Sequence, residues 1–81
     1  MSAAIRKRSV TIAGHSTSLS LEEAFWEDLR ELARRRGVSL NALIGTVDAE
    51  RRGNLSSALR LFILACYRSG ELGPRAGGTG G

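Results

Sequence analysis

Cysteine and histidine are almost absent from this chain of 81 residues, which contains one of each, Cys66 and His15. A disulfide bond within the chain is excluded because it needs two cysteines. A structural zinc site is not expected, since one cysteine and one histidine cannot complete a shell of four ligands. The sequence also has no glycine-rich phosphate loop after a strand and no convincing catalytic set. We therefore predict a protein that is not an enzyme and that binds no cofactor or metal.

Long apolar segments are missing as well. The longest continuous apolar run, residues 61–66, is far shorter than the roughly 20 residues that a membrane-spanning helix needs. The basic residues 6–8 near the N-terminus are not followed by the apolar stretch of a secretory signal. These absences predict a soluble, cytoplasmic protein.

Lysine is scarce, because Lys7 is the only one and the other basic residues are arginines, in a chain of net charge +4. Arginine suits bidentate hydrogen bonding to phosphate groups and to guanine better than lysine does. A basic protein of this kind slightly favours a nucleic acid as its partner.

Two short stretches near the N-terminus, residues 6–12 and 16–21, alternate between apolar and polar side chains as β-strands do. A glycine turn at residues 13–15 separates them. The positions that share the polar faces are Lys7, Ser9 and Thr11 in the first stretch and Ser16, Ser18 and Ser20 in the second. Either the two stretches pair, as a hairpin within one subunit or across a dimer, or the second alone forms a ribbon and the first is an arm.

A helix is predicted over residues 22–36. Ser20 and Glu23 have the spacing of a capping box, in which each side chain bonds the other residue's backbone amide. Acidic residues crowd the first turn and arginines 34–36 the last, which suits the helix dipole, and Gly37 is suited to end the helix. The apolar stripe is predicted to consist of Phe25, Leu29, Leu32 and Ala33, with Trp26 packing on the third helix or on the partner subunit.

Two further helices follow, the first capped by Ser39 and the second, residues 55–68, capped by Asn54. The apolar positions of the first are Leu40, Leu43, Ile44 and Val47, and those of the second are Leu55, Ala58, Leu59, Phe62, Ile63 and Cys66. In the second, Leu61, Leu64 and Ala65 extend the apolar face around most of the helix. Such a helix in so small a chain indicates packing against another subunit, because a domain of this size buries only a modest core.

The order of these elements resembles that of a ribbon-helix-helix domain. The resemblance lies in KRSVTIAGHSTSLSLEEAFWEDLRELARRRGVSLNALI followed by DAERRGNLSSALRLFILACY, and covers residues 6–68. The stretch 16–47 also resembles the Arc and MetJ type of repressor. The resemblance implies a mainly α fold with a short β ribbon and an intertwined homodimer. One strand of each subunit would pair antiparallel with the other, and the resulting ribbon would fit the major groove of double-stranded DNA. Two features depart from the family pattern: serines stand where longer base-reading side chains are usual, and a third helix follows the usual two.

The resemblance also assigns residues to roles. It places Ser16, Ser18 and Ser20 at base edges, and the start of the second helix, Ser39, Leu40 and Asn41, at a phosphate. We add Arg6, Lys7, Arg8 and His15 as phosphate contacts, because they adjoin the ribbon. The expected dimer core consists of Leu19, Phe25, Leu29, Leu32, Leu40, Leu43, Ile44, Val47, Leu59, Phe62 and Ile63.

The domain is expected to span residues 6–69, between a disordered start at 1–5 and a flexible glycine-rich tail at 70–81. The predicted function is that of a small bacterial DNA-binding transcriptional regulator, such as a repressor or an antitoxin-like autoregulator. The alternative is a dimeric interaction module that docks on another protein through its third helix and hardly touches DNA.

Overall fold

The N-terminal part of the protein is a β-hairpin formed within one chain. The computed structural model describes residues 4–73, in which β1 (Ile5–Ile12) pairs antiparallel with β2 (His15–Glu22). The two-residue loop, Ala13 and Gly14, has φ angles of 52° and 82°. Positive φ at both loop residues is the conformation that matches the twist of a tight hairpin. Of the arrangements that the sequence left open, the structure therefore has the hairpin within one chain.

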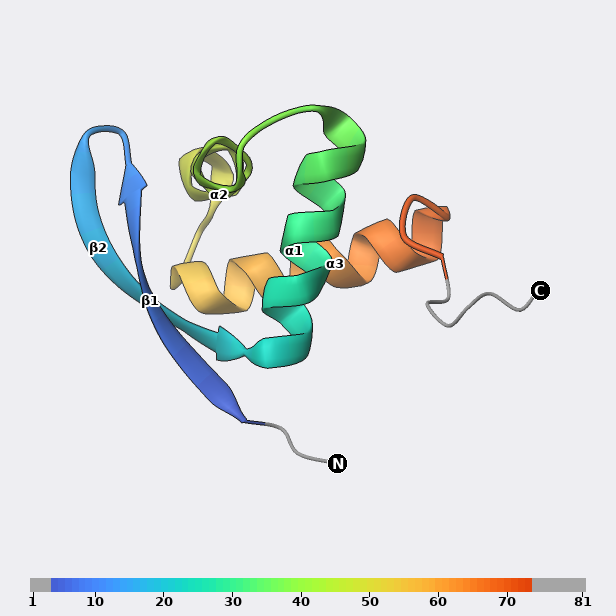
Figure 1. The fold of residues 1–81 in the computed structure, drawn as a ribbon, viewed down its shortest axis with the longest axis horizontal. Helices are drawn as coiled ribbons and strands as arrows, with labels where there is room; N and C mark the ends of the chain where they lie inside the picture. The colour runs from blue at the N-terminus through green and yellow to red at the C-terminus, as the bar shows by residue number, and fades with distance from the viewer. Residues whose placement is uncertain (1–3, 74–81) are drawn as a thin grey trace.

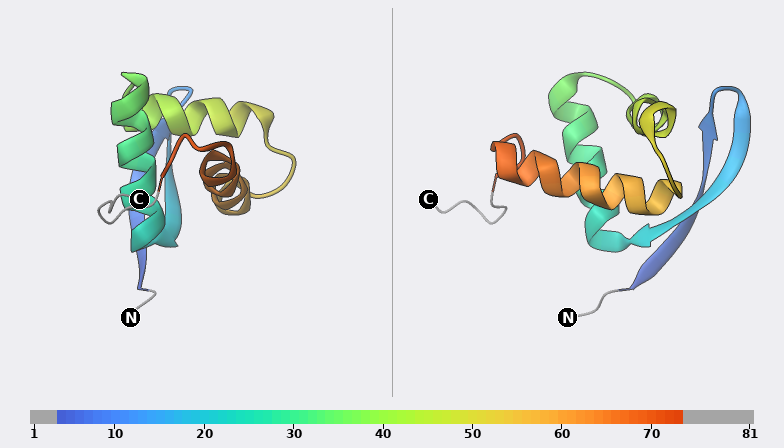
Figure 2. Two further views of the ribbon diagram at one scale, coloured as in Figure 1. Left: turned by 90° about the vertical axis from the view of Figure 1, so that its right-hand side faces the viewer. Right: turned by 180° about the vertical axis from the view of Figure 1, so that it is seen from behind.

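Three helices follow and lie on one side of the hairpin (Figure 1). They are α1 (Glu23–Arg36), α2 (Leu40–Glu50) and α3 (Leu55–Ser69). Figure 1 shows α2 end-on while α1 and α3 lie across the view, and Figure 2 shows α2 from the side. The predicted fold class, a short β ribbon with two helices and an additional third helix, is confirmed.

The ends of the helices agree with the sequence except at the start of α1. The hydroxyl of Ser39 accepts from the amide of Ala42 at 3.0 Å, and the side chain of Asn54 caps α3 in the same way. Gly37 ends α1 with a φ of 70°. The predicted capping box at Ser20 is wrong, because β2 continues to Glu22, which precedes α1 without a side-chain cap. The hairpin extends its ladder to that residue and so keeps Ser20 in the strand.

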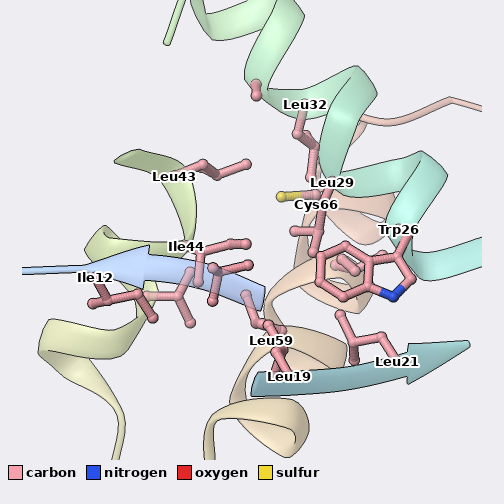
Figure 3. Packing of buried hydrophobic residues seen from close by; sticks show 14 of the residues in the cluster. Ile12, Leu19, Leu21, Trp26, Leu29, Leu32, Leu43, Ile44, Leu59 and Cys66 are labelled. Carbon is pink, nitrogen blue, oxygen red and sulfur yellow. The ribbon is translucent and has the colours of Figure 1, made fainter. Parts of the chain in front are cut away.

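A single chain buries a continuous core between the hairpin and the helices (Figure 3). Val10 and Ile12 of β1 face this core, together with residues from β2 and all three helices: Leu19, Leu21, Trp26, Leu29, Leu32, Ala33, Leu43, Ile44, Val47, Leu59, Ile63 and Cys66. Most of the expected dimer core is therefore already buried without a partner. Leu40 and Phe62 are half-buried at its margin.

The two aromatic residues of α1 both pack on the core, but to different depths. Trp26 is buried, with 1% of its surface exposed, whereas Phe25 is half-buried against the core. The indole Nε1 donates a hydrogen bond to the carbonyl oxygen of Arg6, at 3.0 Å. Periodicity placed Phe25 in the apolar stripe, but it could not show that the hairpin covers the neighbouring face of α1 and buries Trp26 more deeply.

The ordered domain continues past α3. Leu72 is buried and its amide donates to the carbonyl oxygen of Cys66, while the Glu71 carboxylate bonds Arg36 at 2.6 and 2.7 Å. Residues 70–73, expected to belong to a flexible tail, thus hold the end of α3 against the end of α1. The rest of that tail, 74–81, and residues 1–3 of the expected disordered start lie outside the described residues.

Candidate nucleic-acid interface

The hairpin has one apolar face and one polar face. Val10 and Leu19, on different strands, both point to the helices and are buried. Alternation along each strand sends the intervening side chains to the other side, away from the helices. We call this side the outer face; its central cross-strand pairs are Lys7 with Ser20, Ser9 with Ser18, and Thr11 with Ser16, and Ile5 with Glu22 forms the pair at its end.

The outer face gathers the predicted base-contacting residues and enlarges the set. Ser16, Ser18 and Ser20 lie in a row on β2, and all three are exposed. Ser9 and Thr11 lie opposite them on β1, also exposed, and were not included among the predicted site residues. Their alternation with Val10 and Ile12 was visible in the sequence, but only the pairing of the two strands shows that they share a face with the serines.

The three basic residues 6–8 do not lie on one face of the ribbon. Lys7 lies on the outer face, whereas Arg6 and Arg8 pair across the ribbon with Leu21 and Leu19, on the face that meets the helices. Arg6 forms an ion pair with Glu23 at 3.3 Å. The guanidinium of Arg8 lies over the Trp26 ring, 5.6 Å from its centroid. These contacts tie both arginines to α1.

The single histidine also lies away from the outer face. His15 pairs with Ile12 next to the hairpin loop and lines a groove of about 550 Å³. The groove lies between β2 and the connection from α2 to α3, and Arg51 and Arg60 line it as well. Arg51 pairs with Asp48 at 2.6 Å, so the charge of this groove is partly compensated.

The predicted phosphate contact at the start of α2 forms a second polar region. Since the Ser39 hydroxyl caps the amide of Ala42, the amides of Leu40 and Asn41 are the ones left without an acceptor inside the helix. No acidic residue lies in the first turn of α2. The helix dipole there is therefore not compensated, which favours an anion. The Leu40 side chain packs on the core, so this residue offers only its backbone amide.

One carboxylate borders the outer face. Glu22 follows Ser20 by two residues on β2, and its Oε1 accepts from Arg60 Nε of α3 at 2.9 Å. This hydrogen bond is the main reason why the pKa of Glu22 lies below its ordinary value. The charge of Glu22 is thus held beside a compensating guanidinium.

Within residues 4–73, no cluster of histidine, cysteine, aspartate and glutamate could hold a metal ion. Over the same range, no helix combines the length and the apolar character needed to cross a membrane.

Comparison with known proteins agrees with the fold. A solved structure, that of an uncharacterized protein from Bordetella pertussis Tohama I, is similar with a TM-score of 0.69 and 27% sequence identity, over 94% of this chain and 68% of that chain. No functionally curated protein matches the chain. The ribbon-helix-helix domain family, which in general supplies DNA-binding regulators, has a model that matches residues 5–67. Since that match covers both strands and nearly all of the three helices, the chain belongs to the ribbon-helix-helix domain family.

Proposed function

We propose that this protein is a homodimeric transcriptional regulator that binds double-stranded DNA with the outer face of its ribbon in the major groove. The observation that carries the proposal is the outer face itself. Its six central positions are all polar and exposed, and all three helices lie on the opposite side of the hairpin. A solvent-facing surface of this kind is free to meet a ligand along its whole length.

The width of the ribbon supports the major groove as its binding site. A two-stranded antiparallel ribbon has its strands about 4.8 Å apart, and the major groove, about 12 Å wide, admits such a ribbon. Serine and threonine hydroxyls both donate and accept hydrogen bonds, so they can contact any base pair there. Ser9, Thr11, Ser16, Ser18 and Ser20 would supply these contacts.

Phosphate contacts would come from the amides of Leu40 and Asn41 beside Ser39, at the start of α2. Arg6 and Arg8 are anchored to α1, so we assign them the indirect role of holding the ribbon in place. His15, next to the loop, lies off the outer face and would contact a phosphate only at the margin of the site.

A second copy would not be needed to bury the core, which one chain completes. Among the large apolar side chains on the surface of α3, Leu61 and Leu64 are the most exposed, with 66% and 46% of their surface exposed, followed by Tyr67 with 37%. We propose that contacts between the two copies include this part of α3, beside the half-buried Phe62. The same two leucines favour the alternative, a protein partner that docks on α3.

The decisive experiment is a salt titration of binding to duplex DNA of random sequence, with the mass of the protein determined in solution. We expect a dimer whose binding constant falls steeply with salt, with a slope of about 0.9 in log–log terms per phosphate contact. A dimer without affinity for DNA at low salt would overturn the DNA proposal and leave the protein partner on α3.

Two charge variants locate the DNA surface. Ser18→Glu adds a negative charge at the centre of the outer face and is expected to abolish binding through repulsion of the phosphates. Ala24→Glu adds the same charge at an exposed position of α1, on the other side of the hairpin, and is expected to weaken binding far less. Equal losses of DNA affinity in the two variants would mean that DNA binds elsewhere.

A further inference from the structure

Lys7 is the only charged side chain in the three central cross-strand pairs of the outer face. It lies directly opposite Ser20, in line with Ser9 and Thr11 on β1. Every other side chain in these three cross-strand pairs is a hydroxyl. Lys7 is exposed, and the ion pairs of the described residues do not include it.

The charged side chains near Lys7 pair with other residues, so its ammonium group is available to a ligand on the outer face. Arg6 and Arg8, on either side of it, point to the opposite face, where Glu23 and the Trp26 ring hold them. Glu22, the one acid near this end of the outer face, is hydrogen-bonded to Arg60. The Lys7 side chain is thus not drawn toward a carboxylate on its own side of the ribbon.

An ammonium group distinguishes bases in a way that hydroxyls do not. A hydroxyl donates or accepts as required, whereas the lysine ammonium has three donors and no acceptor. In the major groove, guanine presents two acceptors, N7 and O6, to which lysine bonds, while cytosine presents a donor that opposes it. A single lysine among hydroxyls would therefore impose a base preference on a surface that otherwise accepts any sequence.

We propose that Lys7 is the specificity-determining residue of the ribbon and that it selects guanine through N7 and O6. The inference rests on the proposed function, since it assumes that the outer face enters the major groove. It assigns base reading to β1, in addition to the strand that directly precedes α1.

The register also places the guanine within the site. Lys7 lies two residues along β1 from Ser9, which corresponds to about 7 Å along the strand. The rise of DNA is about 3.4 Å per base pair, so this distance spans about two base pairs. The guanine is therefore expected about two base pairs from the pairs that Ser9 and Ser18 contact.

The test is selection of bound duplexes from a random pool, carried out with the full chain and with the variants Lys7→Ala and Arg30→Ala. Arg30 is an exposed residue of α1 that takes part in none of the ion pairs described above, so its loss changes the net charge equally. We expect the unmodified protein and Arg30→Ala to prefer guanine at one position by on the order of tenfold. Lys7→Ala is expected to lose this preference and still bind duplexes.

A second variant, Lys7→Gln, separates base reading from a general effect on charge or folding. Glutamine bonds adenine through N6 and N7, so the preferred base at that position is expected to change from guanine to adenine. If Lys7→Ala binds all sequences more weakly while the guanine preference persists, Lys7 is a phosphate contact and the inference is wrong. If the unmodified protein binds DNA without a guanine preference, the inference alone fails; if it binds no DNA, the proposed function fails with it.

Discussion

The indole nitrogen of Trp26 and the carbonyl oxygen of Arg6 lie 3.0 Å apart and join α1 to β1 across 20 positions of the chain. The ring of Trp26 also lies beneath the guanidinium of Arg8. One buried side chain thus contacts two residues that flank Lys7. The alternation that buries Val10 and Ile12 places Lys7 on the outer face, and the contacts of Trp26 hold its two neighbours on the opposite side.

Replacement of Trp26 by phenylalanine removes the hydrogen bond and part of the buried ring. We expect the free energy of unfolding to fall by about 2 kcal/mol, since the partner carbonyl loses a donor and a small cavity remains. Urea unfolding followed by circular dichroism measures the change. Phe25→Leu, at the neighbouring half-buried position, is the control and is expected to cost less than about 1 kcal/mol. A larger loss for Phe25→Leu would restore the interpretation that Phe25 is the main core residue.

Ala13 adopts a φ of 52° in the hairpin loop, a left-handed conformation that is costly for alanine. Asparagine is favoured at this position of a type I′ turn, so Ala13→Asn is expected to raise the free energy of unfolding by about 0.5–1 kcal/mol. Thermal unfolding measures the gain. Gly14→Ala, at a φ of 82°, is the opposite case and should be destabilising. If Ala13→Asn does not raise the free energy of unfolding, the loop is not a tight two-residue turn.

Arg60 affects the outer face through Glu22. Arg60→Ala removes the hydrogen bond that lowers the pKa of Glu22, so this pKa should return toward its ordinary value and the carboxylate would lie uncompensated beside the DNA site. DNA affinity is expected to fall in Arg60→Ala and to recover in the double variant Arg60→Ala with Glu22→Gln, which restores the original net charge. Binding isotherms at constant salt measure both effects. A double variant as weak as Arg60→Ala would show that Arg60 contacts DNA itself.

Glu31 provides a pH-dependent contribution to stability. Hydrogen bonds from Arg34 and Arg35 lower its pKa from 4.5 to about 2. Because the folded-state pKa is the lower one, this contribution is present above about pH 4.5 and is lost as the pH falls toward 2. Glu31→Gln has no such carboxylate, so its stability should decline less over this range. Carboxyl chemical shifts followed by NMR test the pKa directly, and an ordinary value for Glu31 would contradict the ion pairs.

Several elements could be predicted because their causes are local. Ser39 and Asn54 bond amides three residues ahead, and Gly37 ends α1 in a conformation that glycine adopts easily. The alternation of Val10 with its polar neighbours needs only the geometry of a strand. Other features could not be predicted. The capping box at Ser20 was wrong because the hairpin ladder, a longer-range structure, continued through that residue.

The candidate site divides in the same way. Ser16, Ser18 and Ser20 were recognisable as one face of a strand, whereas Ser9 and Thr11 join them only through the register of the hairpin. Arg6, Lys7 and Arg8 were treated as one basic cluster because they are adjacent in sequence. The alternation along β1 separates Lys7 from the two arginines, and only the structure shows that Trp26, from a helix that begins well beyond them, contacts both arginines.

The sequence by itself determined the order of the elements, the ends of α2 and α3 at their capping residues, and the polar side of each strand. These features follow from interactions between residues a few positions apart. Only the tertiary structure decided that the ribbon forms within one chain, that Trp26 is buried more deeply than Phe25, and that the polar sides of the two strands form one outer face. The physical reason is that burial and cross-strand pairing join residues that are distant in sequence, and local periodicity contains no information on which of two adjacent faces such a partner will cover.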